Sequence, residues 1–362
     1  MINSIKTNAD ALYLHVPFCS SICHYCDFKK NIYHNDKANI WLQDIKKQLD
    51  NEVLNYNLKT IYIGGGTPTS LTYKQLDILL GYLKPYSHNV LEYTIESNIE
   101  NINIELINIL NKYNINRISL GVQSLDNNLL KFMNRKHTKE DIFNKLELLN
   151  NNGINNISID LIYGFKELTL DMFKEHLLLL TSISAIKHIS LYSLTIENNT
   201  YFNRIKYETI SDIQEANFYI LAKQILEKNN FRQYEVANYA REGYESIHNK
   251  YYWRYENFYG IGIGSSGKLG NIRYTKKNND IDYIILDNDD MIFEHIMMNL
   301  RLVCGINIIN FNNKYNINLI NEYKDIIDNY IKDNMLIIDN NYLKATPKGL
   351  LNLNDILVSF LR

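Results

Sequence analysis

Cysteine is scarce in this chain of 362 residues, and its placement excludes one class of protein. Only four cysteines occur, and three of them lie close together near the amino terminus. A disulfide framework would instead spread its cysteines along a small secreted chain, so that class is excluded. The first ten residues are polar, and no apolar stretch of a secretory signal follows them. We therefore expect a reducing compartment, most simply the cytoplasm.

An excess of one charge and a long apolar run are also missing. Lysine and arginine total 38 against 40 for aspartate and glutamate, which gives a formal charge of −2. This balance lacks the basic footprint of proteins that bind nucleic acid or anionic membranes, so no nucleic-acid partner is expected. No run reaches the roughly 20 apolar residues that span a bilayer, so no integral membrane segment is expected either. The composition, 46% hydrophobic and 22% charged, is typical of a soluble globular protein.

The first half of the chain alternates short β-rich runs with longer amphipathic stretches. Such alternation predicts βαβ units, that is, a parallel sheet with helices outside it. Six strands are too few for a closed eight-stranded barrel, so we predict an α/β fold with a partial (β/α)6 barrel. Its active face should lie at the carboxyl ends of the strands. The predicted strands are 11–16, 60–64, 91–96, 117–122, 157–161 and 188–194, and the predicted helices lie near 37–55, 73–84, 103–112, 139–151 and 170–182.

The alternation of strand and helix patterns ends after about residue 194, which indicates a second domain. We therefore divide the chain into residues 1–200, the partial barrel, and residues 201–362, a smaller α+β or helical domain. The carboxyl-terminal end of this second domain is expected to resemble a winged helix. The predicted elements here are a helix near 213–229, a strand near 233–238, a glycine-rich segment at 260–270, and later helices with a hairpin near 335–344.

Cys19, Cys23 and Cys26 have the spacing CxxxCxxC. Thiolates are the ligands that hold iron–sulfur clusters, and four irons normally take four ligands. Three cysteines leave one iron open for a substrate or cofactor, so a [4Fe–4S] cluster is the interpretation we favour. A structural zinc site would need a fourth ligand, and His24 is poorly placed for this inside the short loop. Zinc and plain buried cysteines stay as alternatives on spacing alone.

The residues around the cysteines resemble a known family. Tyr13-Leu-His-Val-Pro-Phe-Cys19 and Cys26-Asp-Phe28 look like the opening of the radical S-adenosylmethionine (SAM) family related to oxygen-independent coproporphyrinogen oxidase. The resemblance implies that the cluster loop follows the first barrel strand and that the amino and carboxylate groups of SAM chelate the open iron. It also implies that an electron from the cluster cleaves SAM to a 5′-deoxyadenosyl radical.

Further segments resemble the SAM-binding motifs of this family, each at the end of a predicted strand. The glycines of Gly64-Gly-Gly-Thr-Pro-Thr69 let a backbone approach a ligand closely, although an ordinary tight turn is the alternative. Glu96 on the barrel interior could pair with the SAM ammonium or with Arg117. Asp160 lies within an apolar run and needs a partner. The residues that the resemblance assigns to SAM are Tyr13, Tyr25, Gly65, Gly66, Thr67, Glu96, Gln123, Arg135 and Asp160.

The glycine segment Gly260-Ile-Gly-Ile-Gly264 is not a dinucleotide fingerprint. Ser265 stands where the third glycine is required, and no βαβ unit follows. The segment resembles instead the one by which the second domain of this family returns to the site.

Two features differ from the true oxidases of the family and resemble its heme chaperone (HemW) branch. Oxidases carry another cysteine where this chain has Phe28, and a long extension where only 18 residues precede Cys19. The resemblance implies heme as cargo, heme-acceptor proteins as partners and an electron donor for the cluster. A radical SAM enzyme acting on a tetrapyrrole is the alternative, and coproporphyrinogen oxidase activity is not expected.

His248 is the candidate heme ligand. It lies beside Tyr251, Tyr252 and Trp253, which could flank a flat macrocycle, and neutral imidazole is a common axial ligand. A packed or hydrogen-bonded histidine is the alternative. Cys304 is predicted to be a buried core cysteine on a methionine-rich helix.

Overall fold

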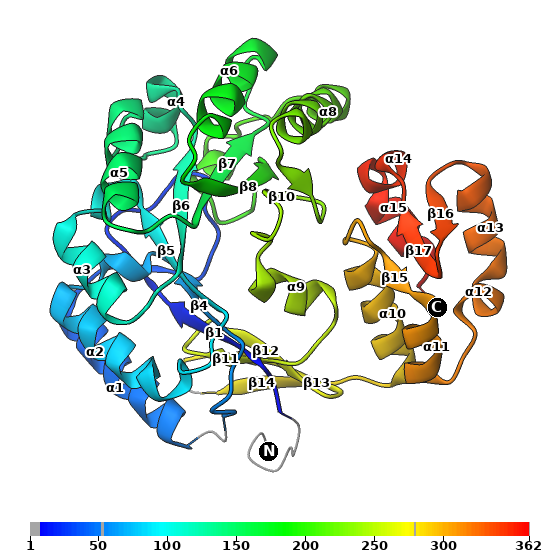
Figure 1. Ribbon diagram of the computed structural model, residues 1–362, viewed down its shortest axis with the longest axis horizontal. Helices are drawn as coiled ribbons and strands as arrows, with labels where there is room; N and C mark the ends of the chain where they lie inside the picture. The colour runs from blue at the N-terminus through cyan, green and yellow to red at the C-terminus, as the bar shows by residue number, and fades with distance from the viewer. Residues whose placement is uncertain (1–7, 52–53, 279, 362) are drawn as a thin grey trace.

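The computed structural model describes residues 8–51, 54–278 and 280–361. A curved sheet of twelve strands forms the larger body, in the order β14-β13-β12-β11-β1-β4-β5-β6-β7-β8-β10-β9. Helices cover the outer side of this sheet, and a second, smaller body lies beside it (Figure 1).

All six predicted strands of the partial barrel are present. They are consecutive neighbours in the sheet, and every pair is parallel. Most of their residues are buried, as expected for a parallel sheet that helices cover. The strands are β1 (Ala11–Val16), β4 (Thr60–Gly65), β5 (Glu92–Asn98), β6 (Arg117–Gln123), β7 (Ile157–Tyr163) and β8 (Ile186–Ser193).

The helices between these strands begin at polar caps. Thr72 and Thr138 each accept a hydrogen bond from the backbone three residues on, and the side chain at that position closes a capping box. The first predicted helix ends at Asn51, and residues 52–53 of its predicted range lie outside the described residues. The crossover helices are α1 (Asn35–Asn51), α2 (Tyr73–Leu83), α3 (Ile104–Lys112), α4 (Asn127–Phe132), α5 (Lys139–Asn151) and α6 (Leu170–Thr181).

Beyond β8 the sheet continues differently from the prediction. After α7 (Tyr201–Arg204) and α8 (Asp212–Lys228), the single strand predicted near 233–238 is wrong. Two short antiparallel strands, β9 (Arg232–Gln233) and β10 (Asn238–Ala240), stand there, because the chain turns back between them. Strand β10 then pairs antiparallel with β8.

The glycine-rich segment also joins the sheet, on the other side of β1. Strand β11 (Phe258–Ile261) lies parallel to β1 and is followed by an antiparallel series of three strands. Gly260 is needed for close approach here, because a Cβ atom at this position would lie 2.1 Å from the Ser266 carbonyl oxygen. The three strands are β12 (Ser266–Leu269), β13 (Ile272–Lys276) and β14 (Ile281–Ile285).

The smaller body follows β14 and has a hydrophobic cluster of its own, from Ile292 to Phe360. Its three-stranded sheet has the order β15-β17-β16, and β16 and β17 form the predicted hairpin. Its elements are α10 (Asn288–Asn299), β15 (Ile306–Asn307), α11 (Ile308–Tyr315), α12 (Leu319–Glu322), α13 (Lys324–Lys332), β16 (Leu336–Asp339), β17 (Tyr342–Ala345), α14 (Pro347–Leu351) and α15 (Leu353–Ser359).

The predicted domain boundary near residue 200 falls inside the larger body. Strands β9 to β14 belong to the same sheet as the barrel strands, and the larger hydrophobic cluster extends to Tyr274. We propose instead a division near residue 286. Residues 1–7 and 362 at the two ends of the predicted domains lie outside the described residues.

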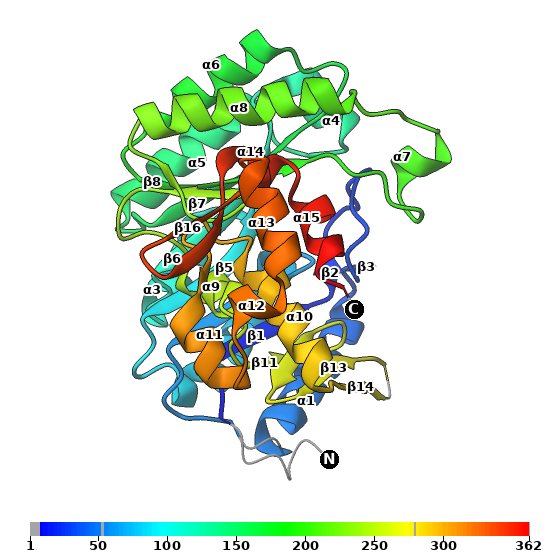
Figure 2. The ribbon, with the colours of Figure 1, turned by 90° about the vertical axis from the view of Figure 1, so that its right-hand side faces the viewer.

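Helix α9 (Ile247–Trp253) links the two bodies. Asn299 on α10 donates a hydrogen bond to the Trp253 carbonyl oxygen at 2.9 Å, and the Tyr255 hydroxyl donates to Glu294 at 2.7 Å. Figure 2 shows the helices of the smaller body from the side that faces away from the barrel. Further contacts between the two bodies are the β-bridge of Glu235 with Leu302 and the ion pair of Arg273 with Glu294 at 3.0 Å.

Cys304 was predicted to be a buried core cysteine on a helix, and this prediction is wrong. The residue is exposed, and α10 ends before it, at Asn299. Within the described ranges, no helix combines the length and the apolar character that crossing a bilayer requires.

A buried carboxylate at the start of β5 holds the beginning of α9. Glu92 accepts hydrogen bonds from the Ser246 hydroxyl at 3.0 Å and from the backbone N–H groups of Ile247 and His248 at 2.7 and 3.0 Å. The two backbone donors are among the N–H groups that a helix leaves unpaired at its N-terminus. Glu92 therefore fixes α9 against the sheet.

Replacing Glu92 should destabilise the protein. In Glu92→Ala, three buried donors lose their acceptor, and we expect the free energy of unfolding to fall by about 3 kcal/mol. Urea unfolding followed by circular dichroism measures this change. Glu105→Ala, an exposed glutamate of α3, is the control and should leave the curve unchanged. Equal stability of the two variants would contradict the role of Glu92.

Candidate functional site

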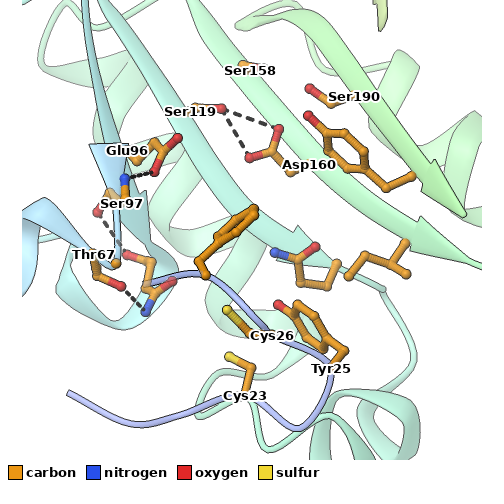
Figure 3. Close-up of a pocket in the computed structure, with 18 of the residues that line it drawn as sticks. Cys23, Tyr25, Cys26, Thr67, Glu96, Ser97, Ser119, Ser158, Asp160 and Ser190 are labelled. Carbon is orange, nitrogen blue, oxygen red and sulfur yellow. Dashed lines mark hydrogen bonds between the residues drawn. The ribbon is translucent and has the colours of Figure 1, made fainter. Parts of the chain in front are cut away.

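The carboxyl ends of the parallel strands open onto a cavity of about 370 Å³. Figure 3 shows Cys23 and Cys26 at one end of it, with Glu96 and Asp160 towards the other. The cavity brings together most of the residues predicted from the sequence, which are Cys19, Cys23, Tyr25, Cys26, Gly65, Gly66, Thr67, Glu96, Gln123, Arg135 and Asp160.

The cysteine loop follows β1 and is closed at its base by two short parallel strands, β2 (Phe18–Cys19) and β3 (Asn31–Ile32). Its tip is tied to the barrel, because the His24 backbone N–H donates to the Met133 carbonyl oxygen at 3.1 Å. The loop is therefore held by backbone hydrogen bonds at both its base and its tip.

His24 is not positioned to act as a fourth zinc ligand. Its Nδ1 is hydrogen-bonded to the Phe132 carbonyl oxygen at 2.7 Å, and its ring stacks on Tyr201 with a centroid distance of 4.0 Å. Both contacts hold the ring against α4 and α7. The three cysteines are thus left without a histidine partner in the loop.

The three thiols line one cavity as separate groups. Burial raises the pKa of Cys19 to about 11 and also raises the pKa of Cys26. Among the described residues, no three His, Cys, Asp or Glu side chains stand close enough together to hold a metal ion as they are. The donor set still fits an iron–sulfur cluster, because three soft sulfur ligands face one space and bound iron deprotonates coordinating thiols.

The glycine motif after β4 serves the cysteine loop directly. The N–H groups of Gly66 and Thr67 donate to the carbonyl oxygens of Val16 and Phe18 at 2.8 and 2.7 Å. A Cβ atom on Gly66 would lie 2.5 Å from the Phe18 carbonyl oxygen, so only glycine allows this approach. Thr67 also donates a hydrogen bond to the Cys19 sulfur at 3.6 Å. The motif therefore positions the first cysteine.

Glu96 is a buried carboxylate with two donors. The Tyr62 hydroxyl and the Gly65 N–H donate to its two oxygens at 2.8 and 3.0 Å. Burial, with repulsion from Asp160, nonetheless raises the pKa of Glu96 to about 7. The alternative pairing with Arg117 is not formed, since that guanidinium donates to Tyr244 and Asn156 instead. Glu96 would therefore gain from a cationic ligand.

Arg135 connects the strands to the cysteine loop. Its guanidinium donates to the Cys23 sulfur at 3.4 Å, to Asn98 at 2.9 Å and to the Gly121 carbonyl oxygen. The Nε atom of Arg135 is buried and has no partner within the described part of the chain. Gln123, at the end of β6, has a left-handed backbone with φ of +69°, next to an irregularity in the strand register. Arg135 is thus a site residue and not a solvated surface arginine.

Asp160 finds its partner in a serine on the neighbouring strand. The Ser119 hydroxyl lies 3.3 and 3.1 Å from its two oxygens, and burial raises the pKa of this carboxyl group. Ser158 and Ser190 line the same part of the cavity, and Figure 3 shows all three serines around Asp160. Sequence reasoning missed these serines. The signal that could have found them is a serine hydroxyl among the apolar residues of each strand. The register of the neighbouring strands β6, β7 and β8 then places these serines close together.

Two predicted residues are not among those that line the cavity, although the rings of both lie beside Tyr62, which does line it. The Tyr13 hydroxyl is hydrogen-bonded to His15 Nδ1 at 3.0 Å. His248 is buried, with Nδ1 bonded to the Thr60 hydroxyl at 2.8 Å and Nε2 to the Tyr252 hydroxyl at 2.6 Å. Burial lowers the pKa of His248 to about 3. Heme ligation by His248 would require one of these bonds to break, because both ring nitrogens have partners.

Comparison with known proteins gives matches to two family models. Residues 13–180 match the radical SAM superfamily, and residues 286–351 match the HemN C-terminal domain. The protein is 34% identical over 370 residues to heme chaperone HemW of Lactococcus lactis subsp. lactis (strain IL1403), covering 97% of each chain. It is 31% identical over 374 residues to HemW of Bacillus subtilis (strain 168), covering 96% of this chain and 98% of that relative.

The fold has a solved counterpart. Coproporphyrinogen III oxidase (HemN) from Escherichia coli, described as a radical SAM enzyme, superimposes with a TM-score of 0.85 at 19% identity, covering 99% of this chain and 92% of the other. The likeness in fold includes the smaller body, where the second family model also matches. With full-length relatives above 30% identity, these findings show that the chain belongs to the heme chaperone HemW family of radical SAM proteins.

Proposed function

We propose that this protein is a heme chaperone that binds a [4Fe–4S] cluster, SAM and heme, and transfers heme to acceptor proteins. One observation carries the proposal. Eleven residues predicted as cluster or SAM ligands line a single cavity, in a chain that resembles HemW proteins over its whole length. Its place of work is proposed to be the cytoplasm, where thiols stay reduced.

In this proposal Cys19, Cys23 and Cys26 hold the cluster. The Arg135 guanidinium, 3.4 Å from the Cys23 sulfur, offsets the negative charge that sulfur ligands bring into a buried site. A cluster held by these cysteines would supply, once reduced by an electron donor, the electron for reductive cleavage of SAM. Asn98 and the Gly121 carbonyl oxygen keep the guanidinium in place through their hydrogen bonds.

The two carboxylates at the other end of the cavity orient SAM. Glu96 would accept a hydrogen bond from the amino group of SAM, and Asp160 would accept hydrogen bonds from its ribose hydroxyls. Gln123 presents its amide from a left-handed position at the strand end. Tyr25, beside Cys23 and Cys26, screens the site from water.

The second candidate is a radical SAM enzyme acting on a tetrapyrrole. A specific observation favours it, since the part of the cavity around Asp160 is rich in hydroxyl groups, which come from Ser119, Ser158 and Ser190. Such a region is shaped for polar groups of a ligand. Phe28, which stands where the oxidases have a cysteine, favours the chaperone.

The ligand set is tested by iron content. Cys23→Ala removes one of three sulfur ligands, so we expect the reconstituted protein to lose most of its iron and its broad visible absorbance. Cys304→Ala is the matched control, because this cysteine lies outside the cavity, and it should retain about four irons per chain. Retention of four irons by Cys23→Ala would remove this residue from the ligand set.

The role of Glu96 is tested by the pH dependence of SAM binding. With a pKa of about 7, the carboxyl group is largely protonated at pH 6, and binding of cationic SAM then has to release a proton. We expect the Kd for SAM to rise as the pH falls from 8 to 6, by up to about tenfold per unit below the pKa. Isothermal titration calorimetry at each pH measures this Kd. Glu96→Gln should bind more weakly and with a flatter profile, and an unchanged profile would exclude Glu96.

The chaperone function itself is tested by heme. We expect an anaerobic titration of cluster-reconstituted protein, followed at the Soret band, to saturate near one heme per chain. This binding should survive competition from a general heme-binding protein. Weak and unsaturable binding would contradict the proposal, and coproporphyrinogen would then be the first substrate to assay.

A further inference from the structure

The cysteine loop is a thin wall between two cavities. The inner cavity is the site described above, and a second cavity of about 380 Å³ lies on the outer side of the loop. Cys23, Cys26 and Lys30 line both cavities. Two of the three predicted cluster ligands are therefore reached from outside the protein as well as from the SAM side.

The far wall of the outer cavity is α7, and it is fixed to the loop. Figure 2 shows α7 projecting from the barrel on the same side as β2 and β3. The Phe202 N–H donates to the His24 carbonyl oxygen at 3.2 Å, and Tyr201 stacks on the His24 ring. The Phe202 ring is buried and stacks on Phe132 at 4.9 Å. Backbone and aromatic contacts thus hold the two walls of the outer cavity, the cysteine loop and α7, in place relative to each other.

Positive charge gathers around this cavity. Lys30 and Arg204 line it, and no Asp or Glu is among the described residues of its lining. Lys29 and Lys206 lie in the same segments of the chain, as do the acidic residues Asp27, Glu197 and Glu208. The whole chain carries a formal charge of −2, so the lining of this cavity has the opposite sign to the protein. Lys30 is oriented by the loop itself, since its Nζ donates to the Cys26 carbonyl oxygen at 2.7 Å.

Apolar side chains accompany the cations. Ile22, Tyr201 and Ile205 have exposed fractions of 43%, 39% and 44%. Large exposed apolar side chains next to cationic ones are the composition of a docking surface. We call these three residues, with Lys30, Arg204 and Lys206, the outer cluster face.

We propose that the outer cluster face docks an acidic one-electron carrier protein that reduces the cluster. The inference rests on the proposed function, because it requires a cluster on Cys23 and Cys26. One electron passes from the reduced carrier to the cluster, the carrier is oxidised by one electron, and no atom is transferred. A cationic rim raises the association rate of an acidic partner and favours it over basic proteins.

The position of the face explains why it suits electron transfer. The SAM cavity lies on the inner side of the loop, so a carrier on the outer side reaches the cysteines without displacing SAM. A heme acceptor would have no use for this proximity to the sulfur ligands. The geometry thus favours an electron carrier over an acceptor as occupant.

The test uses a flavodoxin, an acidic carrier of flavin mononucleotide, as the probe. In Arg204→Glu/Lys206→Glu we expect the Kd for flavodoxin at low salt to rise by at least about tenfold, and cluster reduction by reduced flavodoxin to slow correspondingly. Lys174→Glu/Lys228→Glu makes the same charge change at exposed lysines of α6 and α8, on the outside of the barrel (Figure 1). This control should change both quantities by less than about twofold.

Two further measurements separate docking from damage. Both double variants should retain the iron content of the wild type and be reduced by dithionite at the wild-type rate, since a small reductant needs no docking face. Equal weakening in both variants, or none in Arg204→Glu/Lys206→Glu, would overturn the proposal. Loss of heme transfer to an acceptor with unchanged flavodoxin binding would also overturn it and assign the face to the acceptor. Failure of the heme titration with the flavodoxin effect intact would count against the chaperone function alone.

Discussion

The site depends on the close approach of two backbones, the one entering the cysteine loop and the one leaving β4. The N–H groups of Gly66 and Thr67 donate to the carbonyl oxygens of Val16 and Phe18, and a side chain at Gly66 would prevent this. Because β1 and β4 are parallel neighbours, their carboxyl ends reach the same edge of the sheet. The first cysteine is thereby held above the barrel interior, and the position of the loop follows from this contact.

The electrostatics of the cavity suit a cationic cofactor beside a sulfur-rich group. Burial raises the pKa of Glu96, of Asp160 and of the thiols Cys19 and Cys26, so the protein alone disfavours charge on all four. A cation at the carboxylates and iron at the sulfurs would reverse this preference. Arg135, held by backbone and amide oxygens, is the fixed positive group between the two ends.

The aromatic residues around His248 serve the fold in this structure. The imidazole joins the start of β4 to α9 through Thr60 and Tyr252, and Glu92 ties the beginning of the same helix to β5. The region that sequence reasoning connected to heme is therefore part of the link between the barrel and the smaller body. Heme binding there would be coupled to a change in this link, because His248 has no ring nitrogen without a partner.

The sequence, with the family resemblance of its motifs, determined the six parallel strands, five of the helices between them, the cluster loop and eleven of the residues that line the cavity. These inferences succeeded because period, spacing and motif order are local properties, and parallel strands bring their carboxyl ends together. Tertiary structure alone decided the rest. The serines around Asp160, the partners of Arg135 and the burial of His248 depend on pairing between segments far apart in the chain. The same holds for β11 beside β1 and for α7 against the cysteine loop, since no local pattern specifies which distant surface an element meets.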